Sequence, residues 1–197
     1  MQTDNPPAGD QLLSALGQMG RPFVRFGSLH TPIGRVFVGV SDLGVCDVTF
    51  GETNENRYRN QLARWASRIS REPDAVRLVL SELDAYFRGC LQRFTVEIDI
   101  RVVTVFTARV LSATRTIPFG RLVSYGDIAQ RIGASGASRA VGGALGRNPV
   151  PIIVPCHRVV TQGGRLGGFT GGLDIKRALL RIEGHAMSTP GCVKVRN

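Results

Sequence analysis

Long apolar runs are absent from this 197-residue sequence, and none approaches the roughly 20 residues that a membrane-spanning helix needs. Residues 1–7 are polar and acidic and lack the apolar stretch of a secretory signal. Paired cysteines are absent as well, because the four cysteines are scattered and form no C-x-x-C motif. Free thiols in a reducing compartment fit this spacing better than a disulfide framework does. We therefore expect a cytoplasmic protein without a membrane segment.

Acidic residues are scarce in the second half of the chain. Residues 101–197 contain 14 basic and 3 acidic side chains, whereas residues 1–100 contain 11 and 12. The net charge of +10 is therefore carried by the second half alone. A basic half joined to a neutral half favours a polyanionic partner, with nucleic acid as the first choice and an acidic membrane surface as the alternative. With 43% hydrophobic and 20% charged residues, the chain can also bury a core, which excludes wholesale disorder.

Strands and helices are grouped in the first half, which predicts an α+β fold. After a loose polar arm over residues 1–20, runs of β-branched and aromatic residues separated by turn sequences predict an antiparallel meander. Two helical patterns and one more strand follow. The predicted strands are residues 23–29, 34–40, 44–50 and 93–98, and the predicted helices are residues 56–69 and 73–87.

The second half turns helical at about residue 104, with a first helix that ends before the turn Pro118-Phe119-Gly120. Ser124 and Asp127 then form an S-x-x-D capping box, which opens a short helix that stops at Gly133. A second short helix is predicted over Ala137–Leu145. Two short helices joined by a glycine-containing turn in a basic region predict a helix-turn-helix, although any pair of packed helices would give the same pattern.

The second of these helices has a face made of Arg139, Gly142, Gly143 and Gly146. Each glycine inside a helix costs about 1 kcal/mol relative to alanine, so something should compensate. A face without side chains lets the helix backbone approach a partner closely. That partner is either another helix, packed tightly, or DNA, with Arg139 as the one long side chain that reaches in.

The segment 148–160 is the most unusual in the chain, because three prolines among apolar residues fix a rigid path that delivers Cys156 directly after Pro155. His157 and Arg158 follow, and cationic neighbours can lower the pKa of a thiol from about 8.5 toward neutrality. Cys156 is therefore the candidate nucleophile. The alternative is a buried, inert cysteine, since adjacent side chains need not face each other.

Several motifs of the second half together resemble one family. In chain order they are Ile117-Pro118-Phe119-Gly120, Ser124-Tyr125-Gly126, Arg139-Ala140-Val141-Gly142-Gly143-Ala144, Asn148-Pro149, Pro155-Cys156-His157-Arg158-Val159, Gly167-Gly168-Phe169-Thr170-Gly171-Gly172 and Leu179-Leu180-Arg181-Ile182-Glu183-Gly184. This set resembles the O6-alkylguanine-DNA alkyltransferases, also called methylated-DNA–protein-cysteine methyltransferases. The resemblance is dense over residues 104–184 and covers the first hundred residues only in general layout.

The resemblance implies a domain organisation. An N-terminal scaffold domain over residues 21–102 would carry an antiparallel sheet with helices in a ribonuclease H-like arrangement. A mostly helical, winged-helix-like domain with the helix-turn-helix would follow over residues 103–185. Residues 186–197 would form a C-terminal tail.

The resemblance also implies DNA repair without turnover. Cys156 would attack the alkyl carbon on O6 of a guanine flipped out of duplex DNA and keep the group as a thioether, with O4-alkylthymine as a second substrate. A thioether is not readily hydrolysed, so each molecule would act once. The implied partner is double-stranded DNA containing O6-alkylguanine, bound by a monomer that needs no cofactor. This narrows the choice between nucleic acid and membrane to DNA.

The roles of individual residues are implied by position. His157 takes the proton of Cys156 through water, Glu183 orients His157, and Asn148 braces the turn that leads to the cysteine segment. Tyr125 crowds the backbone phosphate during flipping and helps to protonate the base, and Arg139 fills the vacated stack. The implied DNA-contacting residues are Tyr125, Ser138, Arg139 and Gly142, and the implied pocket residues are Val159, Phe169 and Thr170.

The chain departs from the family pattern at three places. Val103-Thr104-Val105-Phe106 stands where Gly-Thr-Pro-Phe-Gln is frequent, and we expect a difference in packing there. Phe169-Thr170 stands where some members have Tyr-Ser, which bears on the tolerance of bulky alkyl groups. Some relatives hold a structural zinc in the first half, but His30, Cys46 and Cys90 lack ligand spacing, so we predict no metal site.

Two other functions stay open at the level of the sequence. A DNA-binding module could recognise alkylated bases without repairing them, but relatives of that type lack the cysteine. A cysteine hydrolase could use Cys156 and His157, and it would turn over repeatedly on an ester or amide.

Overall fold

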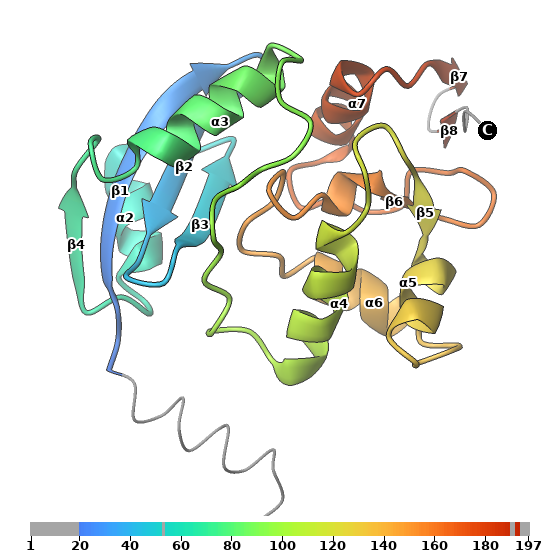
Figure 1. The fold of residues 1–197 in the computed structure, drawn as a ribbon, viewed down its shortest axis with the longest axis horizontal. Helices are drawn as coiled ribbons and strands as arrows, with labels where there is room; N and C mark the ends of the chain where they lie inside the picture. Colours follow the sequence, from blue (N-terminus) through green and yellow to red (C-terminus); the bar gives the residue numbers. More distant parts are fainter. Residues whose placement is uncertain (1–19, 53, 190–191, 194–197) are drawn as a thin grey trace, which may run out of the picture.

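The structure, a computed structural model, describes residues 20–52, 54–189 and 192–193. Figure 1 shows two lobes side by side: a sheet with its helices, built from the first half of the chain, and a group of short helices, built from the second. One hydrophobic core runs through both lobes, since Val36 and Val38 of the sheet belong to the same buried cluster as Val110 and Val154 of the helical lobe. The predicted α+β class is confirmed. The predicted N-terminal arm lies outside the described residues, except for its last residue.

The N-terminal lobe is built on a four-stranded sheet with the strand order β3-β2-β1-β4. β1 (Phe23–Thr31), β2 (Gly34–Val40) and β3 (Val45–Phe50) form the predicted antiparallel meander. The turn from β1 to β2 uses Gly34 at a φ of 98°, a conformation that favours glycine. β4 (Arg68–Arg71) adds a parallel strand beside β1, so the sheet is mixed.

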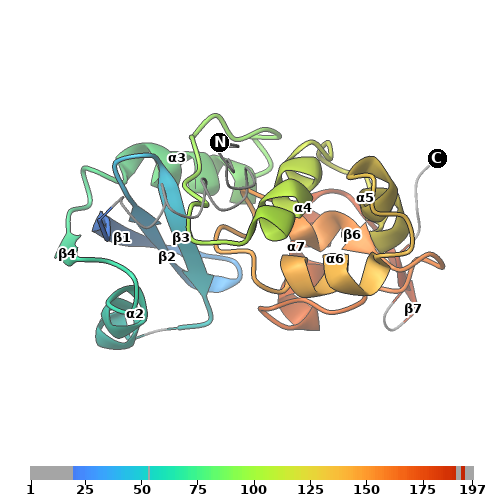
Figure 2. The ribbon, with the colours of Figure 1, turned by 90° about the horizontal axis from the view of Figure 1, so that it is seen from below.

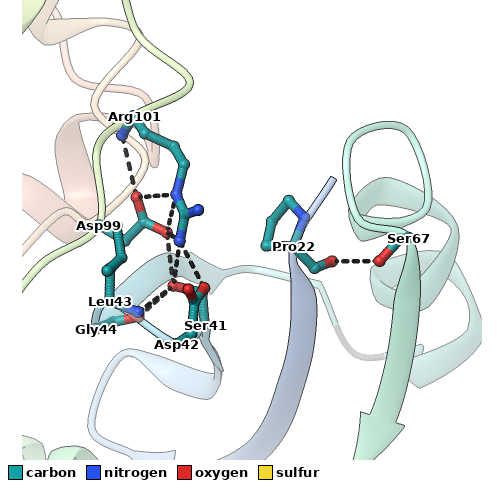
Figure 3. A network of polar contacts seen from close by, with 8 residues as sticks. All are labelled: Pro22, Ser41, Asp42, Leu43, Gly44, Ser67, Asp99 and Arg101. Carbon is teal, nitrogen blue, oxygen red and sulfur yellow. Dashed lines mark hydrogen bonds and ion pairs between the residues drawn. The ribbon is translucent and has the colours of Figure 1, made fainter. Parts of the chain in front are cut away.

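The helix predicted over residues 56–69 is wrong in extent. α2 covers only Glu55–Leu62, and the residues after it lead into β4. Ser67 donates from its backbone N (2.8 Å) and from Oγ (3.1 Å) to the carbonyl oxygen of Pro22 (Figure 3). The open edge of β1 thus offers backbone partners that a local helical pattern cannot reveal. α3 (Arg77–Phe87) likewise begins later than predicted, after a turn over residues 73–76.

The strand predicted over residues 93–98 does not form. Ile98 makes one isolated bridge to Val45. The backbone before it bonds instead to Glu82 of α3, whose carboxylate accepts from the N of Thr95 at 3.0 Å and from the Thr95 hydroxyl. A buried side chain therefore takes the place of a neighbouring strand.

The two helices of this lobe cover opposite faces of the sheet, with α3 on one side and α2 on the other (Figure 2). α3 approaches so closely that a Cβ on Gly27 of β1 would lie 2.6 Å from Cγ2 of Val76. On the opposite face a second buried cluster forms under α2. It contains Val24, Phe26, Phe37, Cys46, Tyr58, Leu62 and Ala66.

The chain crosses between the lobes over residues 88–104, and one polar cluster fixes this crossing to the sheet (Figure 3). Asp99 accepts from Nε of Arg101 at 2.9 Å and from the hydroxyl of Ser41 at 2.6 Å. Arg101 continues to Asp42 at 2.6 Å. The crossing lies so close to the sheet that a Cβ on Gly44 would be 2.5 Å from the carbonyl oxygen of Glu97.

The helical lobe contains the predicted pair of short helices. α5 (Tyr125–Arg131) opens with the predicted capping box of Ser124 and Asp127, and α6 (Ser138–Leu145) packs against both α5 and α4. α4 (Val105–Arg115) is capped by Thr104, whose hydroxyl accepts from the N of Thr107 at 3.2 Å. The helix therefore keeps its N-cap although residues 103–106 differ from the pattern that is frequent in the family.

Several short elements complete the lobe. They are β5 (Val123–Ser124), the 3-10 turn η1 (Cys156–Arg158), β6 (Val159–Val160), α7 (Leu173–Ile182), β7 (Met187–Thr189) and β8 (Cys192–Val193). β5 and β6 pair in parallel, and β7 and β8 pair antiparallel within the predicted tail. Within the described ranges, no helix is long and apolar enough to span a bilayer.

Candidate active site

Cys156 begins η1 and lines a cavity of about 520 Å³, with 7% of its surface exposed. The cavity lies between α6, the start of α5 and the loop before α7. Its lining includes five other residues that the sequence put forward, namely Tyr125, Ser138, Gly142, Phe169 and Thr170. Val159, the third predicted pocket residue, is fully buried and does not line the cavity. Arg139 is exposed on α6, next to Ser138, which does line the cavity.

Asn148 connects the thiol to the turn that precedes it. Its Nδ2 donates to Sγ of Cys156 at 3.3 Å and to the carbonyl oxygen of Val154 at 3.0 Å. Its Oδ1 accepts from the N of Val150 at 3.1 Å. Ile152 within this turn has a φ of 75°, which is strained for a β-branched residue. The amide of Asn148 thus holds the strained turn and the reactive atom in one arrangement.

The expectation that the cationic side chains of His157 and Arg158 lower the pKa of the thiol is wrong, and of these two residues only His157 lowers it, through its backbone N–H. Burial raises the pKa of Cys156, and the donated hydrogen bond of Asn148 and the charge of Lys176 only partly oppose this. Arg158 turns away from the thiol and binds Glu183. The resting side chain is therefore a neutral thiol, and its deprotonation needs a base.

His157 and Glu183 form the predicted pair, fully buried, with Nε2 of His157 at 2.7 Å from Oε1 of Glu183. Burial lowers the pKa of His157, although Glu183 opposes the shift. The pKa of Glu183 is well below its usual range, because His157 and Arg158 outweigh the opposing effect of burial. Among the described residues, Nδ1 of His157 has no hydrogen-bond partner. The imidazole is thus neutral at pH 7, with one nitrogen held and the other able to take a proton.

Three side chains of the site were missed as functional residues. Arg158 donates to both oxygens of Glu183, from Nε at 2.9 Å and from Nη2 at 2.9 Å. Tyr86 of α3 donates to Oε1 of Glu183 at 2.8 Å. Nζ of Lys176 donates to the carbonyl oxygen of Val159 at 2.7 Å and also to that of Leu166, which ties the loop of residues 161–172 to β6.

The signals for these residues were weak. For Lys176 the sequence offers only the scarcity of lysine, of which the chain contains two. The property that marks it, a pKa lowered to about 8 by burial, arises only in the folded protein. Tyr86 lies in a helical pattern of apolar residues, and nothing local indicates that its hydroxyl meets a residue 97 positions later.

Tyr125 packs against the loop of residues 161–172, which also lines the cavity. A Cβ on Gly167, which has a φ of 64°, would lie 2.6 Å from its hydroxyl, so the ring and this glycine fit only together. Gly142 of α6 leaves room beside the same ring, since a Cβ there would be 3.7 Å from Cε1. Arg139, Gly143 and Gly146 are exposed on α6, while Val141, Ala144 and Leu145 are buried. Most of the small-residue face therefore points outward beside the cavity, and only Gly142 faces a side chain of another helix, the ring of Tyr125.

A family model described as the DNA-binding domain of 6-O-methylguanine DNA methyltransferase matches residues 105–185. A methylated-DNA–protein-cysteine methyltransferase of Mycobacterium tuberculosis is 48% identical over 129 residues, which are 66% of this chain and 75% of that protein. The enzyme of the same name from Mycobacterium leprae is 52% identical over 110 residues, which are 56% of this chain and 66% of that protein.

Solved structures agree with these matches. A crystal structure of Mycobacterium tuberculosis OGT in complex with DNA has a TM-score of 0.71 and 40% identity, covering 81% of this chain and 92% of that one. An O6-methylguanine-DNA methyltransferase from the archaeon Pyrococcus kodakaraensis has a TM-score of 0.58 and 26% identity, covering 82% and 99%. The fold, the buried cysteine that lines its cavity and these relatives together define a class of protein that takes a methyl group from DNA. The chain belongs to the methylated-DNA–protein-cysteine methyltransferase family.

Proposed function

We propose that this protein repairs DNA by transferring the alkyl group of O6-alkylguanine to Sγ of its own Cys156, once per molecule. The observation that carries the proposal is that the buried Cys156 lines a cavity of about 520 Å³ while Asn148 donates to its sulfur. As the sulfur–carbon bond forms, the bond between the alkyl carbon and O6 breaks and the guanine leaves with that electron pair. The thioether has no route back to the thiol.

The surrounding groups supply the proton transfers. His157, held neutral by burial, accepts the thiol proton through a water, and the adjacent Glu183 stabilises the imidazolium that forms. Asn148 and the charge of Lys176 stabilise the thiolate. Burial raises the pKa of Tyr125, so its hydroxyl stays protonated and can give a proton to the leaving base.

DNA is the partner that α6 fits. The exposed small residues of α6 allow its backbone to approach a duplex, and Arg139 is placed to fill the position of a base that has moved into the cavity. Ser138 and Gly142 line the cavity beside it. The relative whose structure was solved with DNA supports this partner. In this proposal α5 and α6 act as a helix-turn-helix in a winged-helix-like domain.

Further features of the proposal rest on the resemblance. We take the N-terminal lobe, over residues 21–102, to be ribonuclease H-like and the DNA-binding domain to cover residues 103–185. O4-alkylthymine is a second substrate, and Phe169 and Thr170 set the width of the pocket. The protein works as a monomer in the cytoplasm, without a cofactor or metal.

One experiment tests the proposal. The protein is incubated with duplex DNA containing O6-methylguanine, and its intact mass and peptide masses are measured. We expect a stoichiometric gain of one methyl group at Cys156, lost in Cys156→Ser and retained in Cys90→Ser, which removes an exposed cysteine. Binding without a mass gain would indicate a recognition module, and repeated turnover of an ester without an adduct would indicate a hydrolase. Either result would overturn the proposal.

A second experiment isolates base flipping. Arg139→Ala should slow transfer from duplex DNA by about tenfold or more, because an unfilled stack closes again, and should leave transfer from free O6-benzylguanine unchanged. Arg93→Ala, which removes an exposed arginine of the crossing between the lobes, is the matched control for net charge. Equal slowing on both substrates would contradict the role of Arg139.

A further inference from the structure

Tyr86 brings the N-terminal lobe into the active site. It lies near the end of α3, is fully buried, and donates its hydroxyl to Oε1 of Glu183 at 2.8 Å. The same hydroxyl is 3.3 Å from Nε2 of His157, and the two rings meet edge to face at 6.5 Å. Of the side chains that bond to the carboxylate of Glu183 in the described structure, only Tyr86 comes from the N-terminal lobe.

The hydroxyl of Tyr86 can act only as a donor toward this carboxylate. Burial and the charge of Glu183 raise the pKa of Tyr86 far above its ordinary value, so it stays protonated. The ring itself is fixed by aromatic neighbours, with Phe87 at 5.5 Å, Phe94 at 5.6 Å and Phe119 at 6.1 Å between ring centroids. The donor is therefore aimed at Glu183 by a rigid aromatic surround.

We propose that Tyr86 is a positioning residue for alkyl transfer, which holds Glu183 and thereby fixes the orientation and basicity of His157. This inference rests on the proposed function. Tyr86 withdraws part of the negative charge that Oε1 would otherwise present to the imidazole. His157 thus binds its proton less tightly before the reaction and remains a neutral acceptor at pH 7.

The other charged or titratable groups around His157 define how this effect is observed. Glu183, at the end of α7, favours the imidazolium, whereas the charges of Arg158 in η1 and Lys176 in α7 disfavour it. The thiol of Cys156 is the proton source beside it. Loss of the Tyr86 hydroxyl leaves this set in place and returns charge to Oε1, so the imidazolium gains stability. The transfer rate falls at low pH as His157 becomes protonated, and this acid limb of the pH profile should therefore move to higher pH.

The test compares Tyr86→Phe with Tyr58→Phe, which alters another fully buried tyrosine of the same lobe on the opposite face of the sheet. Single-turnover transfer from O6-methylguanine DNA is measured from pH 5.5 to 9, together with DNA affinity and thermal unfolding. For Tyr86→Phe we expect a rate about tenfold lower at pH 7.5, as for loss of one hydrogen bond to a charged group, and an acid limb raised by about half a pH unit. DNA affinity should not change, and Tyr58→Phe should match the wild type in rate and pH profile.

If folded Tyr86→Phe has the same rate and the same acid limb as the wild type, the inference is overturned. The proposed function would still stand in that case, provided that the wild type forms the methyl adduct. Should Tyr86→Phe fail to fold, 3,5-difluorotyrosine at position 86 keeps the ring and gives a stronger hydroxyl donor. The acid limb should then move to lower pH. An unmoved limb in that protein would overturn the inference as well.

Discussion

Each lobe buries a carboxylate beside an arginine, yet the two clusters do different work. Asp99 of the N-terminal lobe and Glu183 of the helical lobe are 4% and 6% exposed. Asp99 binds Arg101 and the hydroxyl of Ser41, as Figure 3 shows, and Glu183 binds Arg158 and the imidazole of His157. In both cases the pKa of the carboxylate is lowered: hydrogen bonds from Arg101 and Ser41 outweigh burial at Asp99, and His157 together with Arg158 outweighs burial at Glu183.

The difference lies in the remaining donors and their surroundings. The partners of Asp99 are a guanidinium and a hydroxyl, neither of which changes its charge near neutral pH. That cluster fastens the crossing between the lobes. Glu183 instead holds His157, whose Nδ1 has no partner among the described residues and can take up a proton. A buried ion pair alone therefore indicates no function. A buried ion pair that also holds a titratable histidine, in the residue directly after the cysteine that lines the cavity, does indicate one.

The largest effect should come from Glu183→Gln. The imidazolium of His157 would lose its stabilising charge and Arg158 would be left buried without its anion, so we expect transfer to slow at least 100-fold. Single-turnover kinetics with O6-methylguanine DNA measures this, and urea unfolding measures the accompanying loss of stability. A transfer rate within threefold of the wild type would place Glu183 outside the reaction. Glu183 would then have only a structural role, as Asp99 has.

Asp99→Asn should affect folding and spare the chemistry. The neutral amide leaves Arg101 without its buried anion, although Asp42 still reaches the guanidinium at 2.6 Å. We expect a loss of about 2 kcal/mol in the free energy of unfolding and a transfer rate, measured on the folded fraction, equal to that of the wild type. Slower transfer by fully folded protein would mean that the crossing between the lobes also controls the site.

The sequence predicted most of the reactive half, because its signals are local. The capping box of Ser124 and Asp127, the glycine-rich face of α6 and the proline-fixed path to Cys156 each need only neighbouring residues. The pairing of His157 with Glu183 came from the family resemblance. The same local logic failed for β4, whose partners lie on β1, and for residues 93–98, which bond to Glu82.

The electrostatics of the site escaped prediction for a related reason. Adjacency in sequence favoured Arg158 as the cation beside Cys156, but its side chain crosses to Glu183, and Lys176 from α7 supplies the charge that acts on the thiol. Tyr86 reaches the site from the other lobe. Interactions between distant segments decide these contacts, and one sequence carries no local record of them.

A third buried carboxylate, Asp47, extends the comparison of Asp99 with Glu183. The change that we expect from its substitution is the smallest of the three. Within the described part of the chain, Asp47 forms no ion pair with an arginine, and it accepts from the hydroxyl of Thr49 at 2.9 Å and from Nε2 of Gln61 at 3.5 Å. Burial raises its pKa from 3.8 to about 6, the opposite direction from Asp99 and Glu183. The folded state therefore favours the protonated form, and this side chain makes the protein less stable as pH rises from about 4 through 6.

Asp47→Asn removes that penalty while keeping one acceptor for Thr49. We expect the variant to match the wild type at pH 4 and to exceed its free energy of unfolding by about 1 kcal/mol at pH 7.5, since the lost hydrogen bonds offset part of the gain. Urea unfolding at both pH values measures the difference, with the exposed Asp74→Asn as the control. A variant less stable than the wild type at pH 7.5 would show that hydrogen bonding outweighs burial at Asp47, and that a buried carboxylate here needs no arginine to remain ionised.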